Sequence, residues 1–409
     1  MRPLIYEDGS SAFRQKILLS VITNQAIRVK NIRSRSKNPG VTASEVDFLK
    51  LINAISNGAV VKINDTGCIV SFSPGTLVGG EVDFNCSPER GLGYYLEPLI
   101  LLCSFTKLPM SLVLKGVTNN TIDPSVDVLI QSWLPFLKRL LPPASASALN
   151  IEIRQRGLPP KGGGKILFTS KPAHFLSPIQ LLTPGKVYRI RGVAWTCRVS
   201  PNVAPQLVHG AKELLNSFLS DVYINLDQRK REVAGDSSGF GLVLWAVTKE
   251  GIIYTAEACH TAGDDAKSPV VPSELGLKAA SRLLDQIYLG GCVDQALQSA
   301  ALSLMAFEGG HNASQLLISA PTPYTVQTLR LLQKVLGVTF DLTYADHYKA
   351  KKEEEETDGD EEEEEEEIRD GLKSSTDAEN GDSSALQPPT PLVATCFGSG
   401  LKNLNLAIR

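Results

Sequence analysis

The stretch Arg156-Gly157-Leu158-Pro159-Pro160-Lys161-Gly162-Gly163-Gly164 is the most specific local pattern in this chain of 409 residues. Glycine has no Cβ, so it tolerates positive φ angles and lets a backbone amide come close to an anion. The stretch is therefore either a rigid corner between two strands or an anion pocket formed by Arg156, Lys161 and the three glycines. A P-loop does not fit, because its spacing requires glycine at Pro159 and serine or threonine at Ile166.

Around this corner, one pattern of elements recurs three times along the chain. Its order is helix, strand, helix and two strands, with apolar residues three to four positions apart in the helices and alternating in the strands. The predicted helices are 13–23, 44–55, 91–103, 124–141, 293–307 and 326–336, and the predicted strands are 26–32, 59–63, 68–72, 112–115, 149–153, 165–169, 315–318, 338–342 and 392–397. Asp123 is the predicted cap of helix 124–141, with Pro124 at its first position. The pattern predicts an α/β body in which helices cover one face of each sheet.

Two segments interrupt the repeats. Residues 185–285 have the pattern of a separate α/β insert, with predicted strands at 187–199, 222–226, 241–247 and 252–258 and helices at 203–219 and 273–287. The expected organisation is repeats one and two in residues 1–184, the insert in 185–285 and the third repeat in 286–409. Within the third repeat, an acidic loop at about 349–391 is expected to be disordered, because like charges repel one another.

The formal net charge of −3 hides an uneven distribution. Residues 353–382 hold 17 acidic and 2 basic residues, so the remainder of the chain has a net charge of +12. A basic body suits an acidic partner such as RNA, although a merely solvated surface gives the same pattern. Seven dispersed cysteines without a C-x-x-C pair predict reduced thiols in a cytosolic or nuclear protein, and no zinc site. The sequence has no run of about 18 apolar residues, so no membrane helix is expected, and the N-terminal residues show no signal-peptide pattern.

The corner sequence resembles the signature block of the RNA 3′-terminal phosphate cyclases. Similar blocks occur in the family's order at residues 38–40, 72–75, 116–119, 124–127 and 290–294. The likeness covers nearly the whole chain outside the acidic segment. It implies an α/β fold of three repeats, each with two helices and a four-stranded sheet, plus one smaller α/β insert.

The resemblance also implies how the family works. A histidine at the start of the last repeat's second helix attacks ATP and becomes adenylylated. Tyr324 stands at that position here, and a phenol with a pKa of about 10 is a poor replacement for imidazole. The family's glycine-rich N-terminal block is replaced by residues 9–15, and its Asp-Gln pair by Ser299-Ala300. These departures resemble the cyclase-like branch of the family, which implies a protein without catalytic activity, cofactor, metal or small-molecule substrate.

For that branch, the resemblance implies a factor of ribosome biogenesis in the nucleus and nucleolus. It implies that the protein binds a large ribosome-assembly GTPase and pre-rRNA within the small-subunit processome, and promotes early pre-rRNA processing. A membrane partner is not expected. Two alternatives remain open. One is an endoribonuclease that cuts pre-rRNA directly, for which Asp123, Asp127 and Asp294 are the available carboxylates. The other is a cyclase with a displaced nucleophile.

The candidate contact residues are mostly basic. Arg14, Arg33 and Arg35 lie in a basic N-terminal region that suits RNA phosphates, with a solvated strand face as the alternative. Arg330 and Lys334 are one turn apart on a predicted helix, where they would meet a protein partner or RNA, or remain solvated. The anion or RNA candidates are thus Arg14, Arg33, Arg35, Arg156, Lys161, Gly162, Gly163 and Gly164, and the partner candidates are Arg330 and Lys334.

Overall fold

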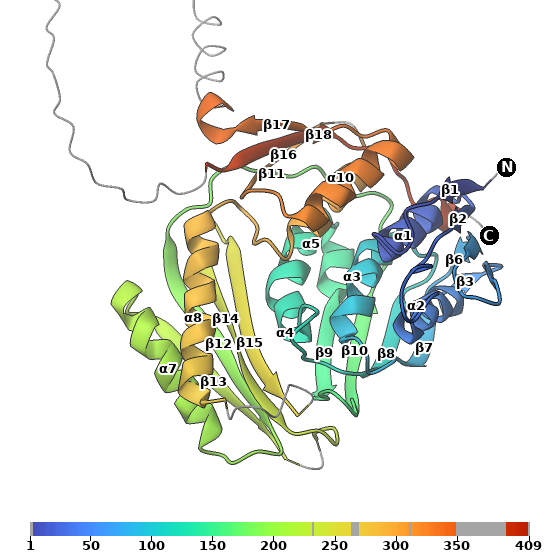
Figure 1. The fold of residues 1–409 in the computed structure, drawn as a ribbon. Coiled ribbons are helices and arrows are strands. Elements are labelled where there is room, and N and C mark those ends of the chain that lie inside the picture. The colour runs from blue at the N-terminus through green and yellow to red at the C-terminus, as the bar shows by residue number, and fades with distance from the viewer. Residues whose placement is uncertain (1–2, 231–232, 263–269, 311, 349–389, 408–409) are drawn as a thin grey trace, which may run out of the picture.

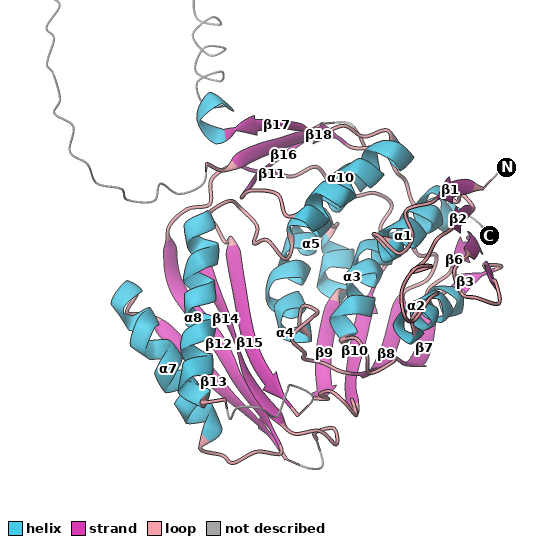
Figure 2. Cartoon of the chain, in the orientation of Figure 1, coloured by secondary structure: helices cyan, strands magenta, loops and turns pink. Residues whose placement is uncertain are grey.

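Four four-stranded sheets and the helices packed on them make up the described structure (Figures 1 and 2). The computed structural model describes residues 3–230, 233–262, 270–310, 312–348 and 390–407. The expected disordered loop at about 349–391 therefore lies outside the described residues, apart from its last two positions.

Three of the sheets have the same strand order. In each sheet, the two strands that come first in the chain are parallel. The strand that comes last in the chain lies third in the sheet, where it pairs antiparallel with the strands on both sides of it. The sheets are β1 (Leu4–Tyr6), β2 (Ile27–Val29), β5 (Val70–Ser73) and β4 (Val60–Ile63); β7 (Gly80–Asn85), β8 (Met110–Gly116), β10 (Gly164–Ser170) and β9 (Asn150–Gln155); and β11 (Gln180–Leu181), β16 (Ala313–Ile318), β18 (Leu392–Phe397) and β17 (Asp341–Tyr344). One order found three times is what a repeated four-stranded unit predicts.

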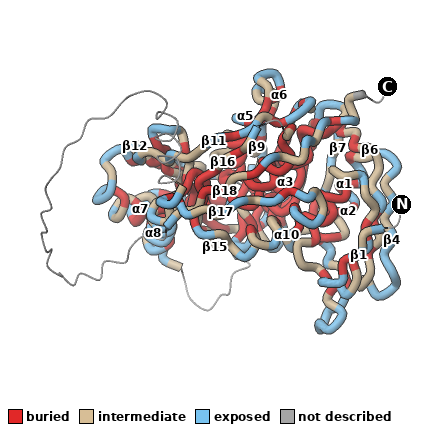
Figure 3. Tube along the Cα trace, turned by 90° about the horizontal axis from the view of Figure 1, so that it is seen from above, coloured by how far each residue is buried: buried red, intermediate tan, exposed pale blue. Residues whose placement is uncertain are grey.

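The helices of these repeats gather between the sheets (Figure 1). They are α1 (Phe13–Thr23) and α2 (Ala43–Ala54); α3 (Leu92–Leu102) and the continuous run of α4 (Val126–Val128), η2 (Leu129–Trp133) and α5 (Leu134–Leu140); and α9 (Gln298–Phe307) and α10 (Pro323–Leu336). Every residue of α3 is buried, as expected for a helix that is apolar on nearly all sides. Buried positions therefore run through the middle of the molecule, with exposed ones around it (Figure 3).

The insert forms its own sheet in the order β13 (Val222–Arg229), β12 (Val187–Cys197), β14 (Gly239–Thr248) and β15 (Ile253–Thr261). Helices α7 (Val203–Phe218) and α8 (Pro272–Leu289) cover one face of this sheet (Figure 1). The two helices approach closely because each has a glycine at the crossing. A Cβ on Gly210 would lie 2.0 Å from the Ser273 carbonyl oxygen, and one on Gly276 would lie 2.1 Å from that of Leu207.

The third sheet draws its strands from distant parts of the chain. Its first strand, β11, precedes the insert, and β16 follows it. Strands β17 and β18 lie on either side of the undescribed acidic segment. The three-part division at residues 184 and 285 stays a prediction. The remaining short elements are β3 (Ser56–Asn57), β6 (Thr76–Leu77), α6 (Pro143–Ala148) and 3₁₀ turns at Cys103–Phe105 and Leu404–Ala407.

Two helix starts differ from the predictions. The helix predicted at 124–141 is capped by Ser125, whose Oγ accepts from the Val128 amide at 3.3 Å, and Asp123 is used elsewhere. The helix predicted from residue 293 begins at Gln298, after a turn in which the Asp294 carboxylate accepts from the Leu297 amide at 2.8 Å. No helix within the described ranges combines the length and apolar character needed to cross a bilayer.

The helix crossing in the insert gives a stability prediction. The Gly276→Ala variant should unfold more readily, by about 1–3 kcal/mol, because its new methyl group has no room against the backbone of α7. Urea denaturation followed by circular dichroism measures this. Ser281→Ala, on the exposed face of the same helix, is the control and should change little. Equal unfolding midpoints for the two variants would contradict the close crossing.

Candidate functional site

The first candidate site surrounds Tyr324, in the first turn of α10. Thr322 caps this helix, since its Oγ1 accepts from the Thr325 amide at 3.1 Å. The Tyr324 hydroxyl donates to Glu97 Oε1 at 2.6 Å and accepts from Arg14 Nη2 at 3.4 Å. Arg14 also pairs with Glu97 at 2.7 Å. The three side chains come from α10, α3 and α1, so one polar cluster joins helices from all three repeats.

The cluster continues toward the second repeat through an aromatic ring. The guanidinium groups of Arg14 and Arg90 lie over the Tyr94 ring, 4.2 and 4.5 Å from its centroid. Each has its own carboxylate, because Arg90 binds Asp123, with Nε to Oδ2 at 2.9 Å. Asp123 also accepts from the Gly91 amide at 2.8 Å and so holds the start of α3. The two like charges are thereby neutralised where they approach the same ring.

This environment determines the chemistry of the phenol. Burial, and then the negative charge of Glu97, raise the pKa of Tyr324 above its ordinary value. The hydroxyl is therefore neutral at physiological pH. Glu97 is 7 % exposed, accepts the hydrogen bond of the phenol and is paired with Arg14. The geometry is that of a stabilising contact between helices.

A second polar group fills the neighbouring space. Gln15 donates to Ser299 Oγ at 3.3 Å and to Thr328 Oγ1 at 2.5 Å, and these two hydroxyls lie 2.8 Å apart. Ser299 and Ala300, where the resemblance implies an Asp-Gln pair in cyclases, are both buried. Small side chains packed against α1 and α10 therefore occupy this region.

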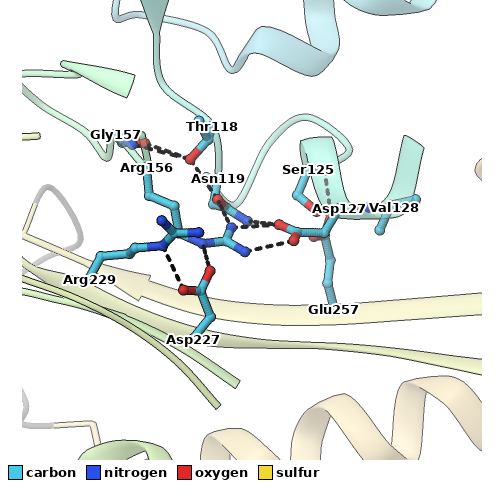
Figure 4. Close-up of polar contacts among 10 residues, drawn as sticks. All are labelled: Thr118, Asn119, Ser125, Asp127, Val128, Arg156, Gly157, Asp227, Arg229 and Glu257. Carbon is cyan, nitrogen blue, oxygen red and sulfur yellow. Dashed lines mark hydrogen bonds and ion pairs between the residues drawn. The ribbon is translucent and has the colours of Figure 1, made fainter. Parts of the chain in front are cut away.

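The second candidate site is the glycine corner, and Arg156 lies at its centre (Figure 4). The side chain is 2 % exposed. Its Nη1 and Nη2 bind both oxygens of Asp127 at 2.7 Å, and its Nε binds Asp227 at 2.8 Å. Asp127 belongs to the second repeat and Asp227 to strand β13 of the insert. Arg156 is therefore a structural link between the two units, and its expected anion-binding role stays a prediction.

The glycines of the corner serve the same junction. A Cβ on Gly235, in the loop before β14, would lie 2.0 Å from the Gly162 oxygen, and one on Gly163 would lie 3.0 Å from Gly235 Cα. Gly162 and Gly163 have φ angles of +68° and +80°, which favour glycine. The Gly235 amide donates to the Arg156 oxygen at 2.6 Å. The backbone that approaches these glycines is thus that of the insert, while the Lys161 side chain is exposed.

Two carboxylates, the half-buried Glu257 and the buried Asp294, hold strand β15 against the repeats. Glu257 accepts from the Ser125 amide at 3.0 Å, and Asp294 accepts from Thr255 Oγ1 at 2.5 Å and from the Leu297 amide at 2.8 Å. Burial raises the pKa of Asp294, and it raises the pKa of Glu257 to about 7. Their contacts connect the insert to the second and third repeats.

A cavity of about 370 Å³ lies between the second repeat and the insert, with Asp123, Glu257, Lys278 and Arg282 among its lining residues. Its carboxylates do not form a metal site. Within the part of the chain that the structure describes, no three His, Cys, Asp or Glu side chains come together in a way that could hold a metal ion. The three carboxylates considered for nuclease chemistry, Asp123, Asp127 and Asp294, are engaged in the contacts above.

The remaining basic candidates are scattered. Arg33 binds Glu45 and donates to the Gly40 oxygen at 2.8 Å, so it supports the start of α2, while Arg35 is exposed in the turn that follows β2. On α10, Arg330 is exposed and the Lys334 ammonium lies 4.7 Å from the centre of the Tyr6 ring. The structure therefore brings Arg14 together with Tyr324, and Arg156 with Lys161 and the glycines, but it does not gather all the candidates into one site.

Several residues of these sites were missed by sequence reasoning. Asp227 and Gly235 lie in the insert, and no local pattern connects them to the corner. Glu97 left a signal, because a carboxylate inside an almost continuous apolar run must find a partner when that run is buried.

The buried pairing of Arg156 gives a second prediction. Arg156→Lys should destabilise the protein by about 3 kcal/mol, because a lysine cannot make the bidentate contact and leaves a buried carboxylate poorly paired. Differential unfolding in urea measures the loss. Arg154→Lys, at an exposed neighbouring position, should be nearly neutral. An unaltered midpoint for Arg156→Lys would show that this junction does not depend on the guanidinium.

Glu257 gives a prediction about pH. Its pKa is about 7 when folded, against about 4.3 for an unfolded glutamate. The folded state therefore binds the proton more tightly, and the associated stability falls as pH rises from about 4 to about 7. Glu257→Gln stays neutral, so its advantage over the wild type should grow across that range to about 1–3 kcal/mol. Unfolding midpoints at several pH values test this, with exposed Glu250→Gln as control. Parallel pH profiles for wild type and Glu257→Gln would refute it.

Comparison with known proteins gives a consistent result. The family described as RNA 3′-terminal phosphate cyclase matches residues 5–342. The RNA 3′-terminal phosphate cyclase-like protein of Homo sapiens is 42 % identical over 335 residues, covering 82 % of this chain and 88 % of that protein. The corresponding protein of Mus musculus is 42 % identical over 333 residues, covering 81 % and 88 %. The rRNA processing protein rcl1 of Schizosaccharomyces pombe is 38 % identical over 298 residues, covering 73 % and 80 %. This chain belongs to the RNA 3′-terminal phosphate cyclase family and, within it, groups with the cyclase-like proteins.

Proposed function

We propose that this chain is a non-catalytic factor of small-subunit ribosome biogenesis. It acts in early rRNA processing in the nucleolus, where it binds pre-rRNA and a large ribosome-assembly GTPase within the small-subunit processome. The names of its relatives, cyclase-like protein and rRNA processing protein, support a role in rRNA processing.

The observation that carries the proposal is the state of Tyr324. The family resemblance assigns the nucleophilic histidine to this position. A histidine becomes adenylylated through a ring nitrogen that titrates near neutrality, whereas this phenol has a raised pKa. Its proton is held by Glu97 and its oxygen accepts from Arg14, so a substrate phosphate would have to displace both contacts.

The loss of chemistry leaves surfaces that suit binding. Outside residues 353–382 the chain has a net charge of +12, which favours contact with RNA. Arg35 and Lys161 are exposed and support pre-rRNA contact. Arg330, exposed on α10 one turn from Lys334, supports contact with the GTPase. Arg14, Arg33 and Arg156 pair with carboxylates of the protein itself, and these contacts stabilise the elements that carry the exposed cations.

The endoribonuclease alternative receives no specific support. Metal-assisted cleavage of RNA needs carboxylates that are free to bind divalent ions. Arg156 holds the pKa of Asp127 below its usual value, against the opposing effect of burial, and both oxygens of Asp127 are bound to that arginine. Asp294 is buried and accepts hydrogen bonds at the edge of the insert.

The proposal predicts that Tyr324→Phe leaves function intact. Neither the wild type nor the variant should form a covalent adenylate with α-labelled ATP, for which an active cyclase is the positive control. In cells depleted of the endogenous protein, both forms should restore processing of the small-subunit rRNA precursor, measured on RNA blots. Loss of the bond to Glu97 should lower stability by only about 1 kcal/mol.

Different results would contradict the non-catalytic role and the assembly role. A labelled band in the wild type that disappears in Tyr324→Phe would establish a tyrosyl nucleophile and overturn the non-catalytic role. Affinity purification tests the partners, because either form should recover processome proteins and a GTPase from cell extract. Failure of the wild type to recover them would remove the assembly role.

A further inference from the structure

Four basic residues lie near the glycine corner, where the insert meets the second repeat. We call Lys161, Arg198, Arg229 and Lys230 the cationic rim. Lys161 comes from the corner itself, and the other three come from the ends of the insert strands β12 and β13. The rim therefore combines side chains from both units that the corner joins.

The backbone contacts keep the members of the rim close together. The Lys161 amide donates to Ser237 Oγ at 3.1 Å, and Arg198 Nη2 binds the adjacent Asp236 at 3.0 Å. The Arg198 amide in turn lies 3.4 Å from the Arg229 oxygen. Lys230 follows directly in the chain. Residues 236 and 237 thus connect Arg198 with Lys161, and Arg198 connects in turn with Arg229.

Among the described residues, positive charge is in excess at this rim, because its four cations face two carboxylates, Asp227 and Asp236. Asp227 is shared, because it binds the buried Arg156 at 2.8 Å as well as Arg229 at 2.6 Å. Among the described residues, Lys161 and Lys230 have no ion-pair partner, and both are exposed. A set of solvent-facing cations without matching anions attracts a polyanion.

The backbone that carries the rim is held in place by the junction between the second repeat and the insert. Arg156 joins the two units beneath it, and Gly162, Gly163 and Gly235 fix the path of the backbone. Such a junction holds donors in place before binding, which reduces the entropy lost when a ligand is bound.

We propose that the cationic rim binds the phosphate backbone of single-stranded RNA across the junction between the second repeat and the insert. This inference rests on the RNA-binding role in the proposed function and assigns it a surface. Lysine ammonium groups act as point charges for phosphates, and arginine guanidinium groups donate in a planar fork. Contacts of this kind give affinity without sequence preference and fall steeply with salt.

The test compares two double variants of the full chain. Lys161→Gln with Lys230→Gln removes the unpaired rim charges. Lys186→Gln with Lys249→Gln removes two exposed lysines at the opposite end of the insert sheet, where the Lys249 amide donates to the Lys186 oxygen at 3.1 Å. Both variants have the same net charge. Because all four lysines are exposed, both should keep the wild-type unfolding midpoint, which circular dichroism checks.

Fluorescence anisotropy with a labelled single-stranded RNA of about 20 nucleotides measures binding over a series of salt concentrations. The rim variant should bind roughly tenfold more weakly at low salt, and the slope of log affinity against log salt should fall by about 1.4, or 0.7 for each lost phosphate contact. The control variant should stay close to the wild type in both measures.

Each contrary outcome has a separate meaning. If the wild type binds RNA and the rim variant equals the control, the rim is not the RNA surface, while the proposed function stands. If the wild type shows no salt-dependent binding, the RNA-binding part of the proposed function fails as well. If the rim variant loses affinity for a labelled poly-glutamate peptide but keeps it for RNA, the rim binds an acidic polypeptide and the RNA assignment is overturned.

Discussion

The position of the insert depends on one buried cation, Arg156. Its guanidinium is almost fully removed from water and is neutralised by a carboxylate from each side of the junction. Taking such a charge out of water is costly, so the contact exists only where both carboxylates are in place. Gly162 and Gly235 make this possible, because the two backbones come too close for side chains. The arginine and the glycines therefore form one junction between the insert and the second repeat, and this junction positions the cationic rim.

A similar principle operates where the three repeats meet. Arg14, Glu97 and Tyr324 come from three different helices, and each satisfies a polar group of another within a largely apolar interior. A position that carries the nucleophile in cyclases, according to the family resemblance, is here a cross-link between repeats. Under the proposed function, the fold keeps the architecture of the family while the chemistry at its centre is replaced by packing and hydrogen bonding.

Periodicity predicted the elements well where a helix or strand has one apolar face. The helix predicted at 13–23 has those bounds in the structure, and the one predicted at 44–55 is found at Ala43–Ala54. The α/β class and the insert with two helices and four strands are also confirmed. Errors arose where a polar residue has a distant partner. Asp123 looked like a helix cap but binds Arg90. The contact of Arg156 with Asp227, 71 residues away, also left no signal in the sequence, while the anion-binding role of Arg156 stays a prediction. Sequence spacing carries no information about such partners, since they meet only through the tertiary fold.

The short strand β11 has a consequence for how the molecule is assembled. Residues 180–181 pair with residues 315–316, and the whole insert lies in the intervening loop. Closing so long a loop carries an entropic cost that must be met before the pairing stabilises anything. During synthesis, the first two repeats and the insert can emerge from the ribosome and fold while β11 still lacks its neighbour. The third sheet is then completed last, when β18 near the C-terminal end takes its central place. A chain truncated before that strand would leave both β16 and β17 without their shared neighbour, and would expose sheet edges suited to aggregation.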